Sequence, residues 1–314
     1  MIVTLTANPS LDRTVTLSTP LRVGEVQSAL SVREDAGGKG INVTRVVVGA
    51  GMRSAAVLPL DADDPFAGVL RSAAVPVVPV PLPGAARANL TIVDGGGVTT
   101  KVNLPGVTRT QADAEALVAA TVQAAHGARW LVLAGSLPPG VADGFYVDVI
   151  RAVRAAGDPP RIAVDTSGAA LHAVVAAGAP DLIKPNDDEL AELTGTALDA
   201  GRDLADAVRV AAADLVPARV GAAFVTLGAA GAVLVTASGA WHGTPPPTRV
   251  RSTVGAGDSS LAGFLLAESA GASPEECLRS GIRYGSAAAA LPGTQAPTPA
   301  DLLPGDVPVR ALAP

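Results

Sequence analysis

The sequence predicts an α/β fold with a mostly parallel central sheet, helices on both faces, and a small β-sheet that forms a lid. Short apolar runs rich in β-branched residues alternate with helix-forming stretches over most of the chain. These runs are apolar on both faces, as strands buried between two helical layers are. Two other segments alternate apolar and polar residues, which predicts strands of a separate, half-exposed sheet.

The individual elements follow from these two periodicities. Strands are expected at Ile2–Thr6, Ala55–Leu60, Trp130–Ala134, Ile162–Asp165, Leu182–Lys184 and Ala222–Leu227. Helices are expected between them, at Lys39–Gly51, Gln111–Ala125, Asp143–Ala156, Asp187–Thr194 and Arg202–Val216. Three short proline-rich pieces, residues 75–83, 244–247 and 292–299, are predicted to be extended connections or turns.

The lid is expected to come from two separate segments, residues 11–33 and 87–107. Neither segment shows helical periodicity. The remaining residues, 1–10, 34–86 and 108–314, are expected to form the α/β core that binds nucleotide and substrate. Two strand-rich insertions in such a core would cover its active face.

Composition and charge exclude several classes of protein. The chain has 314 residues, of which 48% are hydrophobic and 17% charged, so it can bury a sizeable core. Aromatic residues make up 3% and the net charge is −6, which argues against a nucleic-acid or anionic-membrane partner. Cys277 is the only cysteine, and the residues after Met1 resemble a strand, not an export signal. A cytoplasmic protein is therefore expected.

The strongest functional signal is the stretch Ser252–Ser260, which lies directly before an apolar helix. Glycines at a helix start let successive backbone N–H groups converge on one anion, and the helix dipole adds partial positive charge. We expect such a cradle at Gly255, Ala256 and Gly257, with Asp258 placed to accept the proton of an attacking hydroxyl. Taken alone, the pattern is equally compatible with Asp258 as a simple N-cap.

A second glycine cluster, Ala36–Arg45, begins another predicted helix. It combines Gly38 with the point charge of Lys39 and the amide of Asn42 one turn later. This combination suits a phosphorylated or polyhydroxyl substrate. The alternative is an ordinary helix-entry turn with a solvated lysine.

Two familiar phosphate-binding motifs do not match. A Walker A loop requires Ser or Thr after its lysine, whereas Lys39 is followed by Gly40. A dinucleotide fingerprint requires a third glycine and an early position, and Gly255–Ser260 has neither. An oxidoreductase that binds a dinucleotide through these glycines is therefore the weaker alternative.

A third signal, Lys184–Leu190, joins the end of a predicted buried strand to the start of a helix. Asn186 and Glu189 are three residues apart and share a helix face. An amide and a carboxylate placed in this way suit Mg²⁺ held through water. The alternative, compatible with the first, is a capping box that begins the helix.

Several motifs in a fixed order carry a resemblance to a known family. They are Asn8–Asp12, Gly38–Gly40, Gly135–Gly140, Lys184–Asn186, Thr226–Gly231 and Gly255–Asp258. From residue 1 to about residue 290 the chain resembles the PfkB (ribokinase-like) carbohydrate kinases. Within that family it is most similar to 1-phosphofructokinases, tagatose-6-phosphate kinases and the minor type of 6-phosphofructokinase.

The resemblance implies a ribokinase-like three-layer sandwich, ATP and Mg²⁺ as cofactors, and a role for each motif. Asp258 would accept the proton, and Gly255, Ala256 and Gly257 would form the anion hole. Nucleotide would be bound by Lys184, Asn186, Glu189, Thr226, Gly228, Gly231 and Gly257, with Asn186 and Glu189 near magnesium. Substrate would be bound by Asp12, Gly38, Lys39, Asn42, Arg87, Lys101 and Ser136.

Within the implied substrate site, Asp12 and Asn42 would hold sugar hydroxyls. The substrate's existing phosphate would be bound by Lys39, Arg87 and Lys101. Arg87 and Lys101 lie on the lid, so lid closure would complete the site. Alternatively, these lid charges only protect an exposed sheet edge.

The lid departs from the usual 1-phosphofructokinase pattern at two places. The chain has Arg87-Ala88-Asn89 where Arg-Thr-Asn is usual, and Asn103–Gly106 reads Asn-Leu-Pro-Gly instead of Asn-Glu-Pro-Gly. These changes concern sugar specificity and leave the phosphoryl-transfer motifs intact.

The expected reaction is phosphoryl transfer from MgATP to the 6-hydroxyl of D-fructose 1-phosphate, giving fructose 1,6-bisphosphate. Tagatose 6-phosphate and fructose 6-phosphate are the alternative acceptors. Outside the enzyme class, the alternative is a catalytically silent sugar-phosphate sensor. The expected partners are a small sugar phosphate and a second copy of the chain bound through the lid, with neither nucleic acid nor membrane.

Overall fold

Two sheets organise the molecule, for which a computed structural model describes residues 1–198 and 203–313. The large sheet contains β1 (Ile2–Leu5), β4 (Ser54–Pro59), β5 (Val77–Val80), β8 (Trp130–Ala134), β9 (Arg161–Asp165), β10 (Leu182–Ile183), β11 (Ala222–Thr226), β12 (Ala232–Thr236), β13 (Gly239–Gly243) and β14 (Val309–Ala311). The small sheet contains β2 (Ser10–Leu17), β3 (Ala29–Gly37), β6 (Arg87–Val93) and β7 (Thr99–Asn103).

Helices connect most of these strands. They are α1 (Lys39–Gly49), α2 (Phe66–Ser72), α3 (Gln111–Ala125), α4 (Phe145–Ala155), α5 (Gly168–Ala177), α6 (Asp187–Thr194), α7 (Leu204–Ala213), α8 (Ala256–Ser269) and α9 (Pro274–Ala290), with the 3₁₀ turns η1 (Gly228–Ala230) and η2 (Pro299–Asp301). None of the helices in the described ranges is long and apolar enough to cross a membrane.

The large sheet is parallel over most of its width. Its order is β14-β13-β12-β11-β10-β9-β8-β1-β4-β5, and all pairs from β11 to β5 are parallel. Strands β12 to β14 continue it as antiparallel strands. The strand order reverses at β1, since β4 lies on one side of it and β8 on the other. In open parallel sheets, ligands bind beyond the carboxyl ends of the strands at such a reversal.

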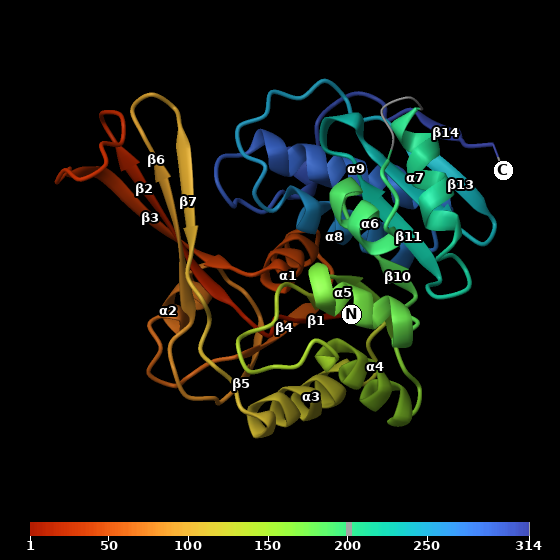
Figure 1. Ribbon diagram of the computed structural model, residues 1–314, viewed down its shortest axis with the longest axis horizontal. Helices are drawn as coiled ribbons and strands as arrows, with labels where there is room; N and C mark the ends of the chain where they lie inside the picture. Colours follow the sequence, from red (N-terminus) through yellow and green to blue (C-terminus); the bar gives the residue numbers. More distant parts are fainter. Residues whose placement is uncertain (199–202, 314) are drawn as a thin grey trace.

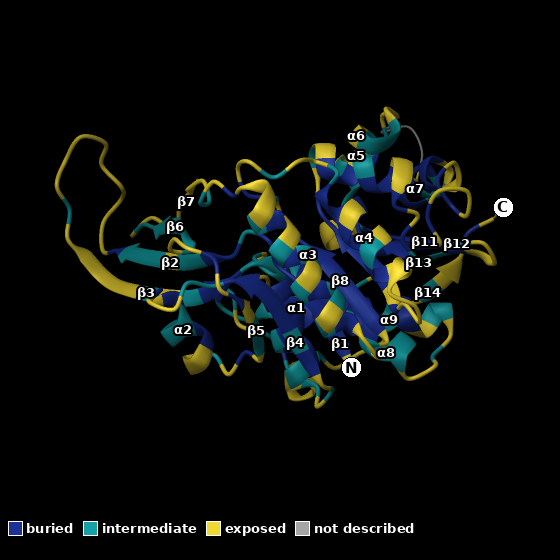
Figure 2. Ribbon diagram, turned by 90° about the horizontal axis from the view of Figure 1, so that it is seen from below, coloured by how far each residue is buried: buried dark blue, intermediate teal, exposed yellow. Residues whose placement is uncertain are grey.

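Helices cover both faces of this sheet, which confirms the predicted three-layer α/β architecture. Successive strand residues point to opposite faces: Val3 and Leu5 pack in the core under α3 to α7, whereas Ile2 packs in the core under α1, α8 and α9. Figure 2 shows the central strands fully buried between the two helical layers. Residues apolar on both faces are therefore what these strands require.

The predicted bounds hold best where the sequence contains a capping box. Helices α3 and α6 begin and end at the predicted residues, and their N-caps Thr110 and Asn186 each form a reciprocal capping box. Two helices that lack a capping box match the prediction less closely. Helix α4 begins at Phe145, two residues later than predicted, and α7 begins at Leu204. The predicted start of the latter, Arg202, lies outside the described residues.

One connection was predicted wrongly. The proline-rich piece at residues 75–83 contains β5, which pairs in parallel with β4. Pro79 lies inside this strand, and an edge strand tolerates it because one side of β5 needs no backbone donor.

The lid sheet combines both predicted insertions in the order β3-β2-β6-β7. Strand β2 is antiparallel to β3 and parallel to β6. Strand β3 continues to Gly37, so residues 34–37 belong to the small sheet although they were expected in the core. Figure 1 shows this sheet standing beside the core next to α1, with its far end directed away from the large sheet.

Candidate active site

A cavity of about 510 Å³ lies where the carboxyl ends of the parallel strands face the lid. The core contributes residues that follow β1, β8, β9 and β10, the last residue of β11, and the starts of α1 and α8, and the lid contributes residues of β2 and β6. The predicted site residues that line this cavity are Asp12, Gly38, Lys39, Asn42, Arg87, Ser136, Lys184, Asn186, Glu189, Thr226, Gly255, Gly257 and Asp258. The fold thus brings together most of the motifs identified in the sequence.

Four predicted site residues do not line the cavity. Ala256 is the first residue of α8, directly beside the lining glycines. Gly228 and Gly231 belong to the turn around η1, which follows Thr226. Lys101 lies on β7, a fully exposed strand.

Asp258 is the third residue of α8 and is 7% exposed. The N-cap of this helix is Gly255, whose φ of 76° favours glycine. Asp258 is therefore not the N-cap, and its Oδ2 accepts a hydrogen bond from Asn42 Nδ2 at 2.8 Å. Burial and the nearby carboxylate of Asp165 raise the pKa of Asp258 to about 6, against the opposing effects of Lys39, Asn42 and Lys184. A carboxyl group with this pKa is suited to act as a base near neutral pH.

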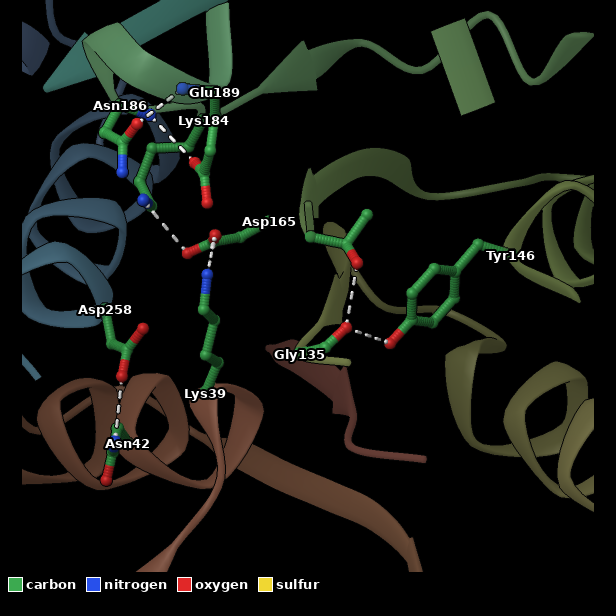
Figure 3. A network of polar contacts seen from close by, with 10 residues as sticks. Lys39, Asn42, Gly135, Tyr146, Asp165, Lys184, Asn186, Glu189 and Asp258 are labelled. Carbon is green, nitrogen blue, oxygen red and sulfur yellow. Dashed lines mark hydrogen bonds and ion pairs between the residues drawn. The ribbon is translucent and has the colours of Figure 1, made fainter. Parts of the chain in front are cut away.

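Asp165, which the sequence reasoning did not assign to the site, does not line the cavity but lies at the centre of the polar network behind its wall. It ends β9 and is fully buried. Its Oδ1 accepts a hydrogen bond from Lys39 Nζ at 2.7 Å, and its Oδ2 forms an ion pair with Lys184 Nζ at 3.1 Å. Figure 3 shows the two lysines reaching Asp165 from opposite sides, beside Asp258 and Asn42.

The two lysines explain why a charged aspartate is tolerated in the core. Burial opposes ionisation of Asp165, but Lys184 and Lys39 together hold its pKa below the ordinary value. Burial likewise opposes the charge of Lys39, yet Asp165 and Asp258 raise the pKa of that lysine. The only sequence signal for Asp165 was a charged residue at the end of an otherwise apolar strand.

The glycine turns allow other groups to come close. A Cβ at Gly257 would lie 3.3 Å from Lys184 Nζ, so this ammonium lies against the predicted anion cradle. Gly38 has a φ of 129°, and a Cβ there would lie 2.7 Å from the Thr6 methyl group. Both glycines therefore determine the shape of the cavity wall.

Asn186 and Glu189 form the capping box of α6. Asn186 Oδ1 accepts from Glu189 N at 2.7 Å, and Glu189 Oε2 accepts from Asn186 N at 2.9 Å. Glu189 Oε1 is not used by this capping box. Within residues 1–198 and 203–313 no cluster of three or more His, Cys, Asp or Glu could hold a metal. The donor set thus fits a magnesium ion bound mainly by water and phosphate, with at most one or two protein contacts.

The lid side of the cavity contains a second polar network. Asp12 Oδ1 accepts hydrogen bonds from Ser10 Oγ at 2.8 Å and Asn89 Nδ2 at 3.0 Å. Burial raises the pKa of Asp12, although the hydrogen bonds from Ser10 and Asn89 and the charge of Arg87 oppose this effect. The guanidinium of Arg87 donates to Leu104 O at 3.2 Å.

Besides Asp165 Oδ2, which is ion-paired with Lys184, four buried polar atoms of cavity-lining residues have no hydrogen-bond partner: Thr6 Oγ1, Asn42 Oδ1, Arg87 Nε and Asn89 Oδ1. Buried polar atoms are normally paired, so these four are available to a polar ligand. Thr6 and Asn89 were not predicted as site residues. Asn89 ends the lid motif Arg87-Ala88-Asn89, which could have indicated it, whereas Thr6 has no signal because its role comes from the packing of the lid strands and the core.

Comparison with known proteins identifies the family. The model of the pfkB family carbohydrate kinases matches residues 6–301. The chain belongs to this family. It is 36% identical to the 1-phosphofructokinase of Rhodobacter capsulatus, a match covering 100% of this chain and 98% of that protein. It is 34% identical to the ATP-dependent 6-phosphofructokinase isozyme 2 of Escherichia coli, with 94% of each chain covered.

The solved structures agree with this assignment. The phosphofructokinase-2 of Escherichia coli, solved in complex with potassium, superimposes with a TM-score of 0.88 at 32% identity, covering 96% of each chain. The fold is thus that of the ribokinase-like pfkB kinases. The protein is a phosphotransferase with an alcohol group as acceptor, as its family membership and its relatives show.

Proposed function

We propose that this pfkB-family kinase transfers the terminal phosphoryl group of ATP to the 6-hydroxyl of D-fructose 1-phosphate, giving fructose 1,6-bisphosphate and ADP. The observation that carries the proposal is the position of Asp258. Its buried carboxylate lies at the start of α8, beside Gly255 and Gly257, in the same cavity as Arg87 of the lid. A buried carboxylate, a glycine-rich helix start and a guanidinium thus line one cavity, which supports roles for them as base, anion cradle and phosphate-binding cation.

In the proposed step, the 6-hydroxyl oxygen forms a bond to the γ-phosphorus of ATP. The bond between that phosphorus and the β,γ-bridging oxygen breaks, and ADP leaves with the electron pair. Asp258 accepts the hydroxyl proton, and the N–H groups at the start of α8 stabilise the negative charge of the transferring group. The positive end of the α8 dipole acts in the same direction.

Different residues of the cavity would bind the sugar phosphate and the nucleotide. Asp12, Asn42 and Asn89 would bind sugar hydroxyls, and Arg87 would bind the phosphate that the sugar already carries. Lys184 and the turn from Thr226 to Gly231 would bind the nucleotide. Asn186 and Glu189 would hold Mg²⁺ through water, and the ion would neutralise charge on the ATP phosphates when bound.

Fructose 6-phosphate is the second candidate acceptor, because the 6-phosphofructokinase isozyme 2 of Escherichia coli is nearly as similar to this chain as the 1-phosphofructokinase relative. Tagatose 6-phosphate remains the third. A catalytically silent sensor is disfavoured by the complete set of Asp258, Lys184 and Glu189 in one cavity.

An ADP-release assay with four acceptors tests the proposal. Fructose 1-phosphate should give a kcat/KM at least tenfold higher than fructose 6-phosphate, tagatose 6-phosphate or free fructose. A higher value with another sugar phosphate would assign that sugar instead. If none of the four acceptors causes ADP release, the proposed substrate class is wrong.

We also propose that two copies of the chain associate through their lid sheets in the cytoplasm. The support is a group of exposed apolar side chains on the lid: Leu30 at 70% and Val32 at 56% on β3, with Val23 and Val26 in the loop that joins β2 to β3. Isolated apolar residues are common on surfaces, but several on one strand and its adjoining loop are typical of an interface. Leu30→Glu should convert a dimer to a monomer in sedimentation measurements, and an unchanged mass would contradict this assembly.

A further inference from the structure

The ammonium group of Lys39 is anchored to the core of the protein, not to the lid. Lys39 begins α1, and its Nζ donates to Oδ1 of the fully buried Asp165 at 2.7 Å. Asp165 belongs to the end of β9, in the middle of the large sheet. The Gly-Lys-Gly turn therefore directs its cation toward the strand ends, as Figure 3 shows.

The second cation on Asp165 connects this pair to the anion cradle. Lys184 Nζ lies 3.1 Å from Asp165 Oδ2, and a Cβ at Gly257 would lie 3.3 Å from that same nitrogen. Two ammonium groups thus share one carboxylate beside Gly257 and Asp258. The two ammonium groups and Asp165 together carry one positive charge, which lies beside the ionisable carboxyl of Asp258 where the helix start of α8 already favours an anion.

Arg87 occupies a different electrostatic environment. Its guanidinium donates to Leu104 O on the lid, and the charge that acts on it most is Asp12. The charges that act on Lys39 are Asp165, Asp258 and Glu189, all on the core side of the cavity. The two cations therefore serve two different parts of the cavity.

We infer that Lys39 is a catalytic residue that neutralises the transferring phosphoryl group, and that Asp165 is the positioning residue that holds Lys39 and Lys184 on either side of it. Arg87 then binds the phosphate that the substrate already carries, without Lys39. This inference rests on the proposed function for the nature of the sugar phosphate. It replaces the expectation that Lys39 and Arg87 bind the same phosphate.

The role follows from the charge that develops during transfer. While the bond from the acceptor oxygen to the γ-phosphorus forms and the bond to the leaving oxygen of ADP breaks, negative charge spreads over the three equatorial oxygens. The acceptor proton passes to Asp258. Cations fixed before the reaction stabilise this charge without further reorganisation, and fixing them is what Asp165 does.

Lys39→Met and Arg87→Met separate the two roles, because methionine keeps the length of the chain without its charge. Lys39→Met should lower kcat with fructose 1-phosphate by about 100-fold and change its KM less than about threefold, as loss of one preorganised donor does. Arg87→Met should raise the KM for fructose 1-phosphate about tenfold or more. With free fructose, which has no phosphate to bind, the defect of Lys39→Met should persist and that of Arg87→Met should shrink.

Transfer to water tests Lys39 independently of the sugar. Lys39→Met should lower the rate of ATP hydrolysis without acceptor by about the same factor as the sugar reaction, since the same phosphoryl group is transferred. Arg53→Met, which removes an exposed cation at the amino ends of β1 and β4, opposite the cavity, should hydrolyse ATP at the wild-type rate. If wild type phosphorylates none of the sugar phosphates, the proposed substrate is wrong, and the hydrolysis rates still decide the role of Lys39.

Asp165→Asn tests the positioning role. The amide still accepts one hydrogen bond but cannot balance two ammonium groups, so kcat should fall by tenfold or more while the KM for fructose 1-phosphate stays within about threefold. A merely structural role would lower the melting temperature and leave kcat per folded molecule unchanged. That result would overturn the role of Asp165. A Lys39→Met variant with normal ATP hydrolysis and a raised KM for the sugar phosphate would overturn the whole inference.

Discussion

The most informative single residue is Asp258, because its chemistry depends on its protonation state. Asp258→Asn keeps the shape of the side chain but cannot accept the proton of the sugar hydroxyl. We expect turnover to fall by about 10² to 10⁴-fold, the usual contribution of a positioned general base. ADP release under saturating substrates measures this, with the melting temperature as a control for folding. An unchanged turnover would remove Asp258 from the mechanism.

The pH dependence should report the same carboxyl group. Its pKa in the free protein is raised to about 6, and only the ionised form accepts a proton. We therefore expect kcat/KM to increase about tenfold per pH unit below pH 6 and to level off above it. A flat profile between pH 5 and 7 would contradict the role of Asp258 as the base.

The raised pKa also predicts a stability cost at the active site. The folded-state pKa of Asp258 lies above the ordinary value, so the protonated carboxyl favours the folded state. Its contribution to the free energy of unfolding is complete only below the unfolded-state pKa and is lost as pH rises through about 6. Above pH 6 the ionised form is therefore unfavourable in the fold. Asp258→Asn should raise the free energy of unfolding at pH 8 by about 1–3 kcal/mol. Urea unfolding at pH 8 checks this, and a destabilised variant would contradict the electrostatic account.

At the scale of elements, the start of α1 depends on Gly38. An alanine there would have both an unfavourable φ of 129° and a methyl group 2.7 Å from the Thr6 side chain. Gly38→Ala should cost about 2–4 kcal/mol and disturb the cavity.

Gly51 is the matched control, since it follows α1 at a φ of 82° with open space around its Cβ position. Gly51→Ala should cost only about 1 kcal/mol, the penalty for the left-handed conformation alone. Equal costs for Gly38→Ala and Gly51→Ala in urea unfolding would show that crowding against Thr6 is unimportant.

Elements with local signals could be predicted from the sequence. The capping boxes at Thr110 and Asn186 determine the starts of α3 and α6, and each box involves only residues close together in the sequence. Strand β5 was missed because Pro79 is a poor strand residue anywhere except at an edge, and its edge position depends on the order of the whole sheet.

At the scale of the whole molecule, the sequence predicted the layers and the lid but not the strand order. The same limit applies to the site. Asp258 and Lys39 lie in glycine turns, which are visible as local patterns. Asp165 has no motif of its own, and its importance arises only because β9 lies beside β10 and faces the start of α1. Residues whose function comes from such long-range neighbours cannot be found from local spacing.

In the proposed arrangement of the whole molecule, the large sheet and its helices position the phosphoryl-transfer groups, and the lid supplies most of the sugar-binding ones. The most direct test is a crystal structure with a non-hydrolysable ATP analogue and fructose 1-phosphate. We expect the terminal phosphate within hydrogen-bonding distance of the backbone N–H groups of residues 255–257, and the sugar 6-hydroxyl on the Asp258 carboxylate. A terminal phosphate bound away from the start of α8 would contradict the account.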